Sequence, residues 1–166
     1  MYINKETAEA VGTGVLSKEE LINLTNYIRE NIPLMNYMQV KVNYLLDYSI
    51  KLTAPLEPNS NHYGSAFGGS ISTLGIAAGW ALLQSKISRE NLNTRLVIQS
   101  SNSRFIRPAK ESFEAVCSIT TESWFQFKSK ILTDNKAKIF LRSELFSENQ
   151  IIAVQEGLYV ALDPSK

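Results

Sequence analysis

Two adjacent glycines, Gly68 and Gly69, stand at the start of the most apolar stretch of the chain. Helical spacing in that stretch would place the pair at a helix N-terminus, where unpaired N–H groups carry a partial positive charge of about half an elementary unit. Glycines lack a Cβ, so a carbonyl oxygen can come close to these donors, and removing one such donor costs about a hundredfold or more in acyl transfer. The pair therefore predicts an oxyanion site. The alternative is that both glycines serve only tight packing of the helix against a sheet.

Side chains around the glycine pair are candidates for orienting or activating a reacting group. Before the pair come Asn61, His62, Gly64 and Phe67, and directly after it comes Ser70. His62 is the only histidine, and imidazoles suit general base work near neutrality, but a loop histidine is also commonly a solvent-facing residue. Asp47, at a predicted strand turn, is another candidate base, although turn carboxylates often just bond the backbone. Ser70 is placed to bond a carbonyl or a water, or to serve the helix N-terminus.

Basic residues form two groups that could meet phosphate. Arg104, Arg107 and Lys110 cluster at a predicted strand end, and Lys128, Lys130, Lys136 and Lys138 spread over a predicted helix and its exit. A solvated face is the alternative, and we favour it for the lysines. The single cysteine, Cys117, lies in the apolar register of a strand and is expected to pack there. One histidine and one cysteine cannot supply three ligands, so neither a metal nor another cofactor is predicted.

Composition limits the function classes. The chain has 166 residues and is 44% hydrophobic, which suits one globular domain. A net charge of +1 provides no field for a nucleic acid or an anionic membrane, so neither is expected as a partner. The stretch 67–83 falls short of the roughly 20 residues of a membrane span. The first fifteen residues contain Lys5 and Glu6 where a signal peptide would be apolar, and the lone cysteine cannot form an internal disulfide. We therefore expect a cytoplasmic protein.

The elements that would position the site follow from periodicity. Residues 1–16 lack any period and are expected to be a flexible segment before a single domain over 17–166. A capping box at Ser17 to Glu20 begins an amphipathic helix that Pro33 stops. Alternating patterns predict strands over 38–44, 48–54, 96–106, 112–120, 137–146 and 151–162, and the last two form a hairpin. Helical spacing predicts a buried helix over 69–87 and a short helix that starts near Trp124 and ends at 134–135.

The central helix is apolar on every side, so we expect it to be buried on every side. A curved antiparallel β-sheet wrapped around this long helix would cover it, and that α+β arrangement is the hotdog fold. Pairing of two such sheets edge to edge would protect an exposed edge strand. A homodimer is therefore expected, and a tetramer is the larger alternative.

The motifs resemble a known family. Asn61-x-x-Gly64-x-x-x-Gly68-Gly69 before an apolar helix, with Arg104 to Pro108 opening a later hairpin, resembles the hotdog-fold acyl-CoA thioesterases. More closely, Ala54-Pro55-Leu56, Phe67-Gly68-Gly69-Ser70 and Gly79-Trp80 look like the thioesterase domain that some bacteria carry behind an acetyltransferase, the YiiD C-terminal type. The resemblance spans about residue 30 to the end.

The resemblance implies that the chain hydrolyses an acyl-CoA or acyl-carrier-protein thioester, with the carbonyl at the Gly68 and Gly69 amides. It implies that Asn61 orients the carbonyl or the attacking water, and that the acyl chain follows the buried helix past Trp80. Phe67 stands in place of the histidine that is usual in the hotdog-fold acyl-CoA thioesterases, and Ile76 in place of the carboxylate often found further along their helix. These departures keep other hypotheses open: a noncatalytic acyl-CoA-binding module, a hydratase or dehydratase, and a purely structural dimerisation domain.

Overall fold

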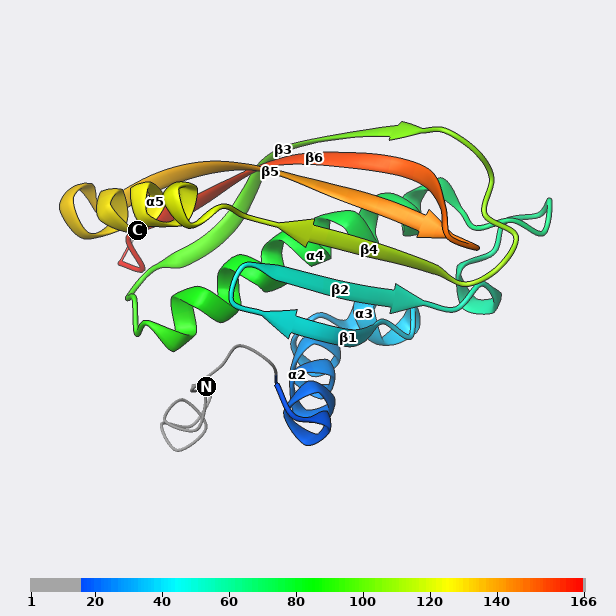
Figure 1. Ribbon diagram of the computed structural model, residues 1–166, viewed down its shortest axis with the longest axis horizontal. Helices are drawn as coiled ribbons and strands as arrows, with labels where there is room; N and C mark the ends of the chain where they lie inside the picture. The colour runs from blue at the N-terminus through cyan, green and yellow to red at the C-terminus, as the bar shows by residue number, and fades with distance from the viewer. Residues whose placement is uncertain (1–15, 166) are drawn as a thin grey trace.

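A six-stranded antiparallel sheet curves over one long helix in the computed structural model, which describes residues 16–165. The elements are α2 (Lys18–Asn31), α3 (Pro33–Tyr37), β1 (Lys41–Leu46), β2 (Ser49–Ala54), α4 (Gly68–Arg89), β3 (Arg95–Phe105), β4 (Phe113–Ser118), α5 (Thr121–Asp134), β5 (Lys136–Ser147) and β6 (Gln150–Leu162). The strands lie in the order β1-β2-β4-β5-β6-β3, and α4 crosses the concave face (Figure 1). This confirms the predicted hotdog fold. Apart from Leu16, the segment predicted to be flexible lies outside the described residues.

Local signals in the sequence explain most element boundaries. The predicted capping box is present at the start of α2: Ser17 N–H donates to Glu20 Oε2 at 2.7 Å, and Glu20 N–H donates to Ser17 Oγ at 3.2 Å. The predicted short helix is α5, which Thr120 caps and which Asn135 ends in the left-handed conformation, with φ 52°. The predicted hairpin is β5–β6. Proline 33 both ends α2 and begins α3, because its missing N–H costs nothing at a first helical position.

Helix α4 docks on the sheet through small residues and two side-chain hydrogen bonds. Ser143 of β5 donates to the carbonyl of Gly75, and Tyr159 of β6 donates to the carbonyl of Ile76, each at 2.8 Å. A Cβ at Gly79 would lie 2.7 Å from Cζ of the Tyr159 ring and nearer still to its hydroxyl oxygen. The glycine therefore lets the helix approach the sheet closely enough for both bonds to form.

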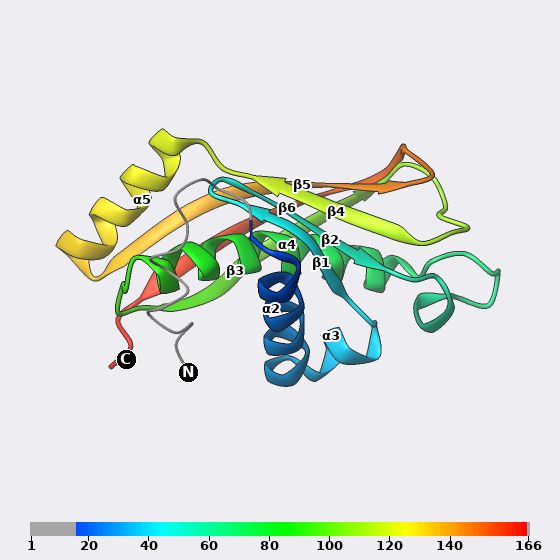
Figure 2. The ribbon, with the colours of Figure 1, turned by 60° about the horizontal axis from the view of Figure 1, so that its bottom comes forward.

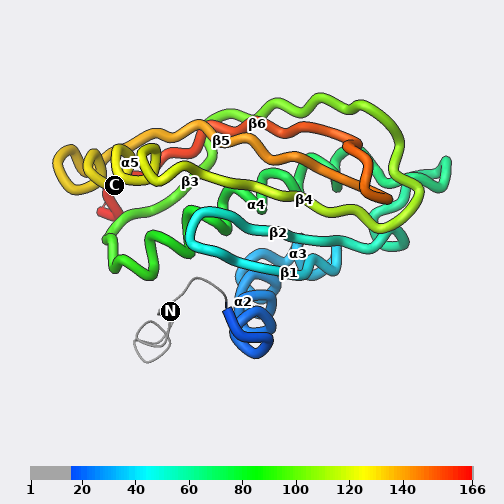
Figure 3. The backbone as a smooth tube through the Cα atoms, viewed as in Figure 1, coloured from blue at the N-terminus to red at the C-terminus, as the bar shows by residue number. Residues whose placement is uncertain are grey.

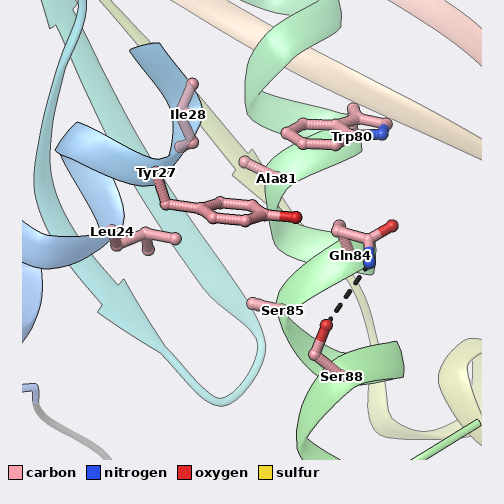
Figure 4. A pocket seen from close by; sticks show the side chains of 8 residues that line it. All are labelled: Leu24, Tyr27, Ile28, Trp80, Ala81, Gln84, Ser85 and Ser88. Carbon is pink, nitrogen blue, oxygen red and sulfur yellow. Dashed lines mark hydrogen bonds between the residues drawn. The ribbon is translucent and has the colours of Figure 1, made fainter. Parts of the chain in front are cut away.

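The sheet covers only one side of α4. The other side packs against α2, which stands across α4 and β1 away from the sheet (Figure 2). Ile28, Leu24 and Tyr27 of α2 face Trp80 and Ala81 of α4 around a cavity of about 20 Å³ (Figure 4). The amphipathic N-terminal helix therefore covers part of the face of α4 that the sheet leaves open.

Strand β1 departs from the predicted alternation. Val40, Val42 and Tyr44 were expected to share one face, but the β1–β2 register shifts between Val42 and Tyr44. Such a bulge adds a residue to one strand and reverses the faces beyond it. As a result Leu45 is buried in the core, whereas Tyr44 is only partly buried.

Strands β3 and β4 do not form the hairpin that the Arg104 to Pro108 motif was expected to open. β3 pairs only with β6 at one edge of the sheet, and β4 lies between β2 and β5 (Figure 3). The chain after β3 must therefore cross from the edge to the middle of the sheet. Alternation alone cannot reveal this, because it shows that a segment is a strand but not which strand it pairs with.

No helix in the described part of the chain has both the length and the hydrophobicity needed to cross a membrane.

Candidate functional site

The glycine pair forms the first turn of α4, as predicted. Phe67 is the N-cap residue, and its side chain makes no capping hydrogen bond. Ile71 N–H bonds to the Phe67 carbonyl at 3.1 Å, but the N–H groups of Gly68, Gly69 and Ser70 bond to none of the described residues. This helix of 22 residues therefore begins with three free N–H donors. The helix dipole adds partial positive charge at the same end. This is an arrangement that can bind a carbonyl oxygen or an oxyanion.

Two phenyl rings lie against the positions that Cβ atoms of the glycines would take. A Cβ at Gly68 would lie 3.3 Å from Cζ of Phe105, and a Cβ at Gly69 would lie 2.9 Å from Cδ1 of Phe67 and nearer still to its Cε1. The nearest heavy atoms at both positions are ring carbons. Phe105 comes from the end of β3, so the site joins an edge strand to the helix start. Phe105 did not stand out as a site residue in the sequence, because its distance from Gly68 along the chain hides the contact.

Backbone and side-chain hydrogen bonds fix the loop before the helix. Asn61 Oδ1 accepts from Tyr63 N–H at 2.9 Å and from Ser65 N–H at 3.4 Å, and Asn61 Nδ2 donates to Ser65 Oγ at 3.1 Å. Gly64 has φ +72°, which suits this turn. Ala66 N–H then donates to the Ala109 carbonyl at 2.8 Å, which ties the loop to the chain after β3. Both ends of the Asn61 amide are therefore engaged in shaping the loop.

A second asparagine, Asn59, lies deeper and carries no obvious sequence signal, because it sits in a polar stretch between Pro58 and Ser60. Its side chain is only 2% exposed, and Nδ2 donates to the carbonyls of Met38 and Pro55 at 3.0 and 2.8 Å. Its own carbonyl accepts the Phe67 N–H at 2.7 Å. Asn59 therefore anchors the N-cap residue of α4 to the segment before β1. Asn59 Oδ1 has no partner among the described residues.

The two candidate bases are not placed alike. His62 is exposed in the loop before α4, and its ring is tilted against that of Tyr63, with centroids 3.8 Å apart. Asp47 lies in the β1–β2 turn and pairs with Arg89, the last residue of α4, at 3.5 Å. Because 22 helical residues span roughly 33 Å, Asp47 is at the opposite end of α4 from the glycines of the same chain. The hypothesis that Asp47 serves its own glycine pair as a base is therefore wrong.

The other predicted site residues are Ser70, Trp80, Arg104 and Arg107. Ser70 is in the first turn of α4 and only partly buried. Trp80, expected beside an acyl tunnel, lines the cavity between α4 and α2 (Figure 4). Phe105 faces α4, so Arg104, its neighbour along β3, projects from the opposite face of the sheet. Arg107 Nη1 donates to Gln150 Oε1, at the beginning of β6.

Perturbed titratable groups lie away from the glycine pair. Burial raises the pKa of the Cys117 thiol to about 11, beneath the middle of α4. Burial lowers the pKa of Lys86, whose Nζ donates to the Asp47 carbonyl at 2.9 Å near the far end of α4. Within residues 16–165, no three His, Cys, Asp or Glu side chains are grouped so that they could hold a metal ion. The chemistry that the site offers is hydrogen bonding from backbone donors between apolar walls.

Comparison with known proteins gives one family and a set of solved structures. The family model described as "Putative thioesterase (yiiD_Cterm)" matches residues 21–163. A structure from Shewanella oneidensis, described as a putative thioesterase, is 25% identical over 88% of this chain and 99% of that chain, with a TM-score of 0.74. A protein of unknown function from Chlorobaculum tepidum TLS is 24% identical over 87% of this chain and 95% of that one, with a TM-score of 0.81. A protein from Pseudomonas aeruginosa, described as a probable thioesterase, is 24% identical over 91% and 99%, with a TM-score of 0.75.

Proposed function

The chain belongs to the YiiD C-terminal thioesterase family, and from that premise we propose that it hydrolyses an acyl thioester carried on coenzyme A or on an acyl-carrier protein. Membership of the family supports thioester hydrolysis in general. The carrier and the roles of individual residues are the proposal. The observation that carries it is the set of three free N–H groups at Gly68, Gly69 and Ser70, at the positive end of α4.

In the proposed reaction the thioester carbonyl oxygen accepts hydrogen bonds from these backbone donors. A water oxygen attacks the carbonyl carbon, and the carbonyl electron pair moves onto the oxygen, where the donors and the helix dipole stabilise the negative charge. When the C–O double bond re-forms, the C–S bond breaks and the thiolate leaves. The products are a carboxylic acid and the free thiol, which takes up the proton lost by the water. Fixed donors favour this step because they need no reorganisation as charge develops.

The proposal assigns Gly68 and Gly69 to the oxyanion and Phe67 to substrate contact, with Gly64 and Asn61 shaping the loop that presents them. Asn61 acts through this loop, since both ends of its amide are engaged there. Ser70 contributes its backbone N–H. Arg107 lies on the surface near the end of β3 and is the candidate contact for the phosphates of coenzyme A.

A noncatalytic acyl-CoA-binding module is the second candidate function. Its support is that Phe67 and Ile76 occupy the positions where hotdog-fold acyl-CoA thioesterases usually carry a histidine and a carboxylate, and that ring carbons are the nearest atoms to the glycine Cβ positions. Such a protein would bind the same thioester at the same donors but would lack a group to accept the proton of water.

We also propose that the protein is a homodimer joined through β3. Side chains of α2 already occupy the edge beside β1: Arg29 Nε donates to the Val40 carbonyl at 2.8 Å, and Thr25 Oγ1 accepts the Val42 N–H at 3.0 Å. β3 pairs on one side only, with β6. An open edge favours pairing with a second copy. Phe105 lies on this strand, so the second copy would border the glycine site.

The test is thiol release from straight-chain acyl-CoA substrates of increasing length, measured for the wild type and for Gly69→Val. Valine at this position puts a branched side chain among the donors and the Phe67 ring, so kcat/KM should fall by about a hundredfold. Ser88→Val, at the other end of α4, controls for a β-branched residue in the same helix and should retain activity within about threefold. Circular dichroism must show that both variants stay folded.

Equal activity of Gly69→Val and the wild type would refute the oxyanion assignment. If the wild type releases no thiol from any substrate, calorimetric titration with the same thioesters separates the two candidates. Binding that Gly69→Val loses would establish the acyl-binding module, whereas no binding by the wild type would refute both functions for coenzyme A thioesters.

A further inference from the structure

Phe67 and Phe105 are unusually exposed for phenyl rings that are packed against backbone. The exposed fractions of their side chains are 57% and 52%, although each ring lies against a glycine of the first turn of α4. Phe67 turns back from the N-cap over Gly69, and Phe105 reaches Gly68 from the end of β3. Each ring is thus held beside the free N–H groups, and more than half of it is exposed within a single chain.

The two rings stand on different sides of the helix end. Successive residues in an α-helix are about 100° apart around the axis, so the Cβ positions of Gly68 and Gly69 point in different directions. Each ring takes one of these positions, and no ring contact joins Phe67 to Phe105 within the described residues. The two rings therefore border the first turn on two sides and do not touch each other.

This geometry constrains any carbonyl that reaches the donors. The carbonyl carbon has the acyl α-carbon on one side and the thioester sulfur on the other. An unbranched α-carbon leaves room beside rings that border the donors, whereas a quaternary α-carbon is wide in every direction and would press against them. The walls also remove water from around the carbonyl, which strengthens its hydrogen bonds to the donors.

We propose that Phe67 and Phe105 form an aromatic clamp that selects thioesters by the width of the acyl group at its α-carbon, favouring unbranched over α-branched acyl groups. This inference rests on the proposed function, because it assumes that a thioester carbonyl binds at the glycine pair. It makes Phe105 a specificity-determining residue and gives Phe67 a role of its own at the position where hotdog-fold acyl-CoA thioesterases usually carry a histidine.

The experiment compares butanoyl-CoA with 2,2-dimethylpropanoyl-CoA, which differ in branching at the α-carbon. The measured quantity is the ratio of kcat/KM for the two substrates. The wild type should favour butanoyl-CoA, and Phe67→Ala and Phe105→Ala should each reduce that preference by about tenfold, a size typical of changes in an apolar pocket. Phe67→Tyr and Phe105→Tyr keep the ring and should keep the wild-type ratio.

Phe140→Ala is the matched control, because Phe140 is also a phenyl ring with high exposure, 61%, but lies on β5. It should leave the ratio unchanged. A structural role of the rings would lower kcat/KM for both substrates by the same factor and would leave the ratio at its wild-type value. That result, or a ratio that changes equally in Phe140→Ala, would overturn the clamp.

The results that would refute the clamp differ from those that would refute the proposed hydrolysis. If the wild type cleaves neither compound, both remain intact ligands, and their dissociation constants are measured by calorimetric titration. A wild-type preference for butanoyl-CoA that both alanine variants reduce supports the clamp even though hydrolysis is refuted. No preference in the wild type, or no binding of either compound, overturns the clamp itself.

Discussion

At the residue scale, Gly68 and Gly69 combine two roles, the presentation of free N–H donors and close packing against phenyl rings. Their N–H groups are free, and the space of their missing Cβ atoms is filled by the rings of Phe105 and Phe67. Any larger side chain must therefore displace a ring as well as crowd a donor. The packing role and the proposed oxyanion role therefore fall on the same two glycines, because the rings that pack against them also border the N–H donors.

His62 is the residue whose contribution is easiest to measure, since it is the only histidine of the chain. Its ring is exposed and rests on Tyr63, and no described side chain holds it toward the glycine pair. We expect His62→Ala to keep kcat within about threefold and to leave the pH profile of kcat/KM unchanged, because an unoriented imidazole contributes little to general base catalysis. A loss of activity that flattens the profile near neutrality would instead identify His62 as the base.

Cys117 makes the stability of the protein depend on alkaline pH. Burial raises the pKa of its thiol from 9.0 to about 11 in the folded state. Between these values the folded chain holds the proton more tightly than the unfolded chain, so the stabilisation present below pH 9 is lost as the pH rises toward 11. Urea unfolding should show the wild type losing stability relative to Cys117→Ala across this range. A constant difference between the two proteins would contradict the burial of a protonated thiol.

The same burial predicts that folded Cys117 reacts slowly with thiol reagents at pH 8, because the thiolate is the reactive form. Thiol release measured with such a reagent then has little background from the folded protein.

At the element scale, the docking of α4 on the sheet depends on Gly79. Alanine there would place a Cβ against the Tyr159 ring, which is itself buried and hydrogen-bonded to α4. We expect Gly79→Ala to reduce the free energy of unfolding by about 3 kcal/mol, at the upper end of the usual cost of overpacking. Chemical denaturation followed by circular dichroism measures this change.

Ser72→Ala, on a partly exposed part of α4, is the control for helix propensity and should change stability by less than about 0.5 kcal/mol. Combining Gly79→Ala with Tyr159→Phe removes the hydroxyl oxygen nearest to the new Cβ and should recover part of the loss. If Gly79→Ala were as stable as the wild type, α4 could move away from Tyr159 without loss of stability, and the prediction would be wrong.

At the scale of the whole molecule, the two edges of the sheet differ. α2 occupies the backbone groups beside β1, whereas β3 presents an open edge with Val97 and Asn102 exposed. We expect the wild type to have twice the chain mass of 18.6 kDa in solution. Lysines at Val97 and Asn102 would bring like charges together across a β3–β3 pair, so this double variant should be monomeric.

Light scattering coupled to size exclusion measures both masses, and Asn43→Lys on β1 is the matched control that should remain dimeric. If the double variant keeps the wild-type mass, the copies do not join through β3. If the double variant is instead monomeric, its activity shows whether the second copy contributes to the site. Phe105 lies on the same strand as the two substitutions.

The amino-acid sequence by itself determined the elements whose causes are local. The Ser17 capping box, the end of α5 at Asn135, the β5–β6 hairpin and the apolar length of α4 are each encoded in neighbouring residues, and each is found where the pattern predicts it. The same local logic predicted the glycine pair at a helix start, and hence the free donors. The family motifs lie in this same stretch, which is why the resemblance could be seen in the sequence.

Only the tertiary structure decided which distant segments meet. It paired β3 with β6 and not with β4, set Phe105 against Gly68, buried Asn59 under the N-cap of α4, and moved Asp47 to the far end of that helix. Alternation along a strand is the same whichever neighbour the strand takes, so pairing depends on which surfaces the rest of the fold leaves to be covered. The donors of the site therefore follow from local sequence, whereas the walls around them follow from the fold.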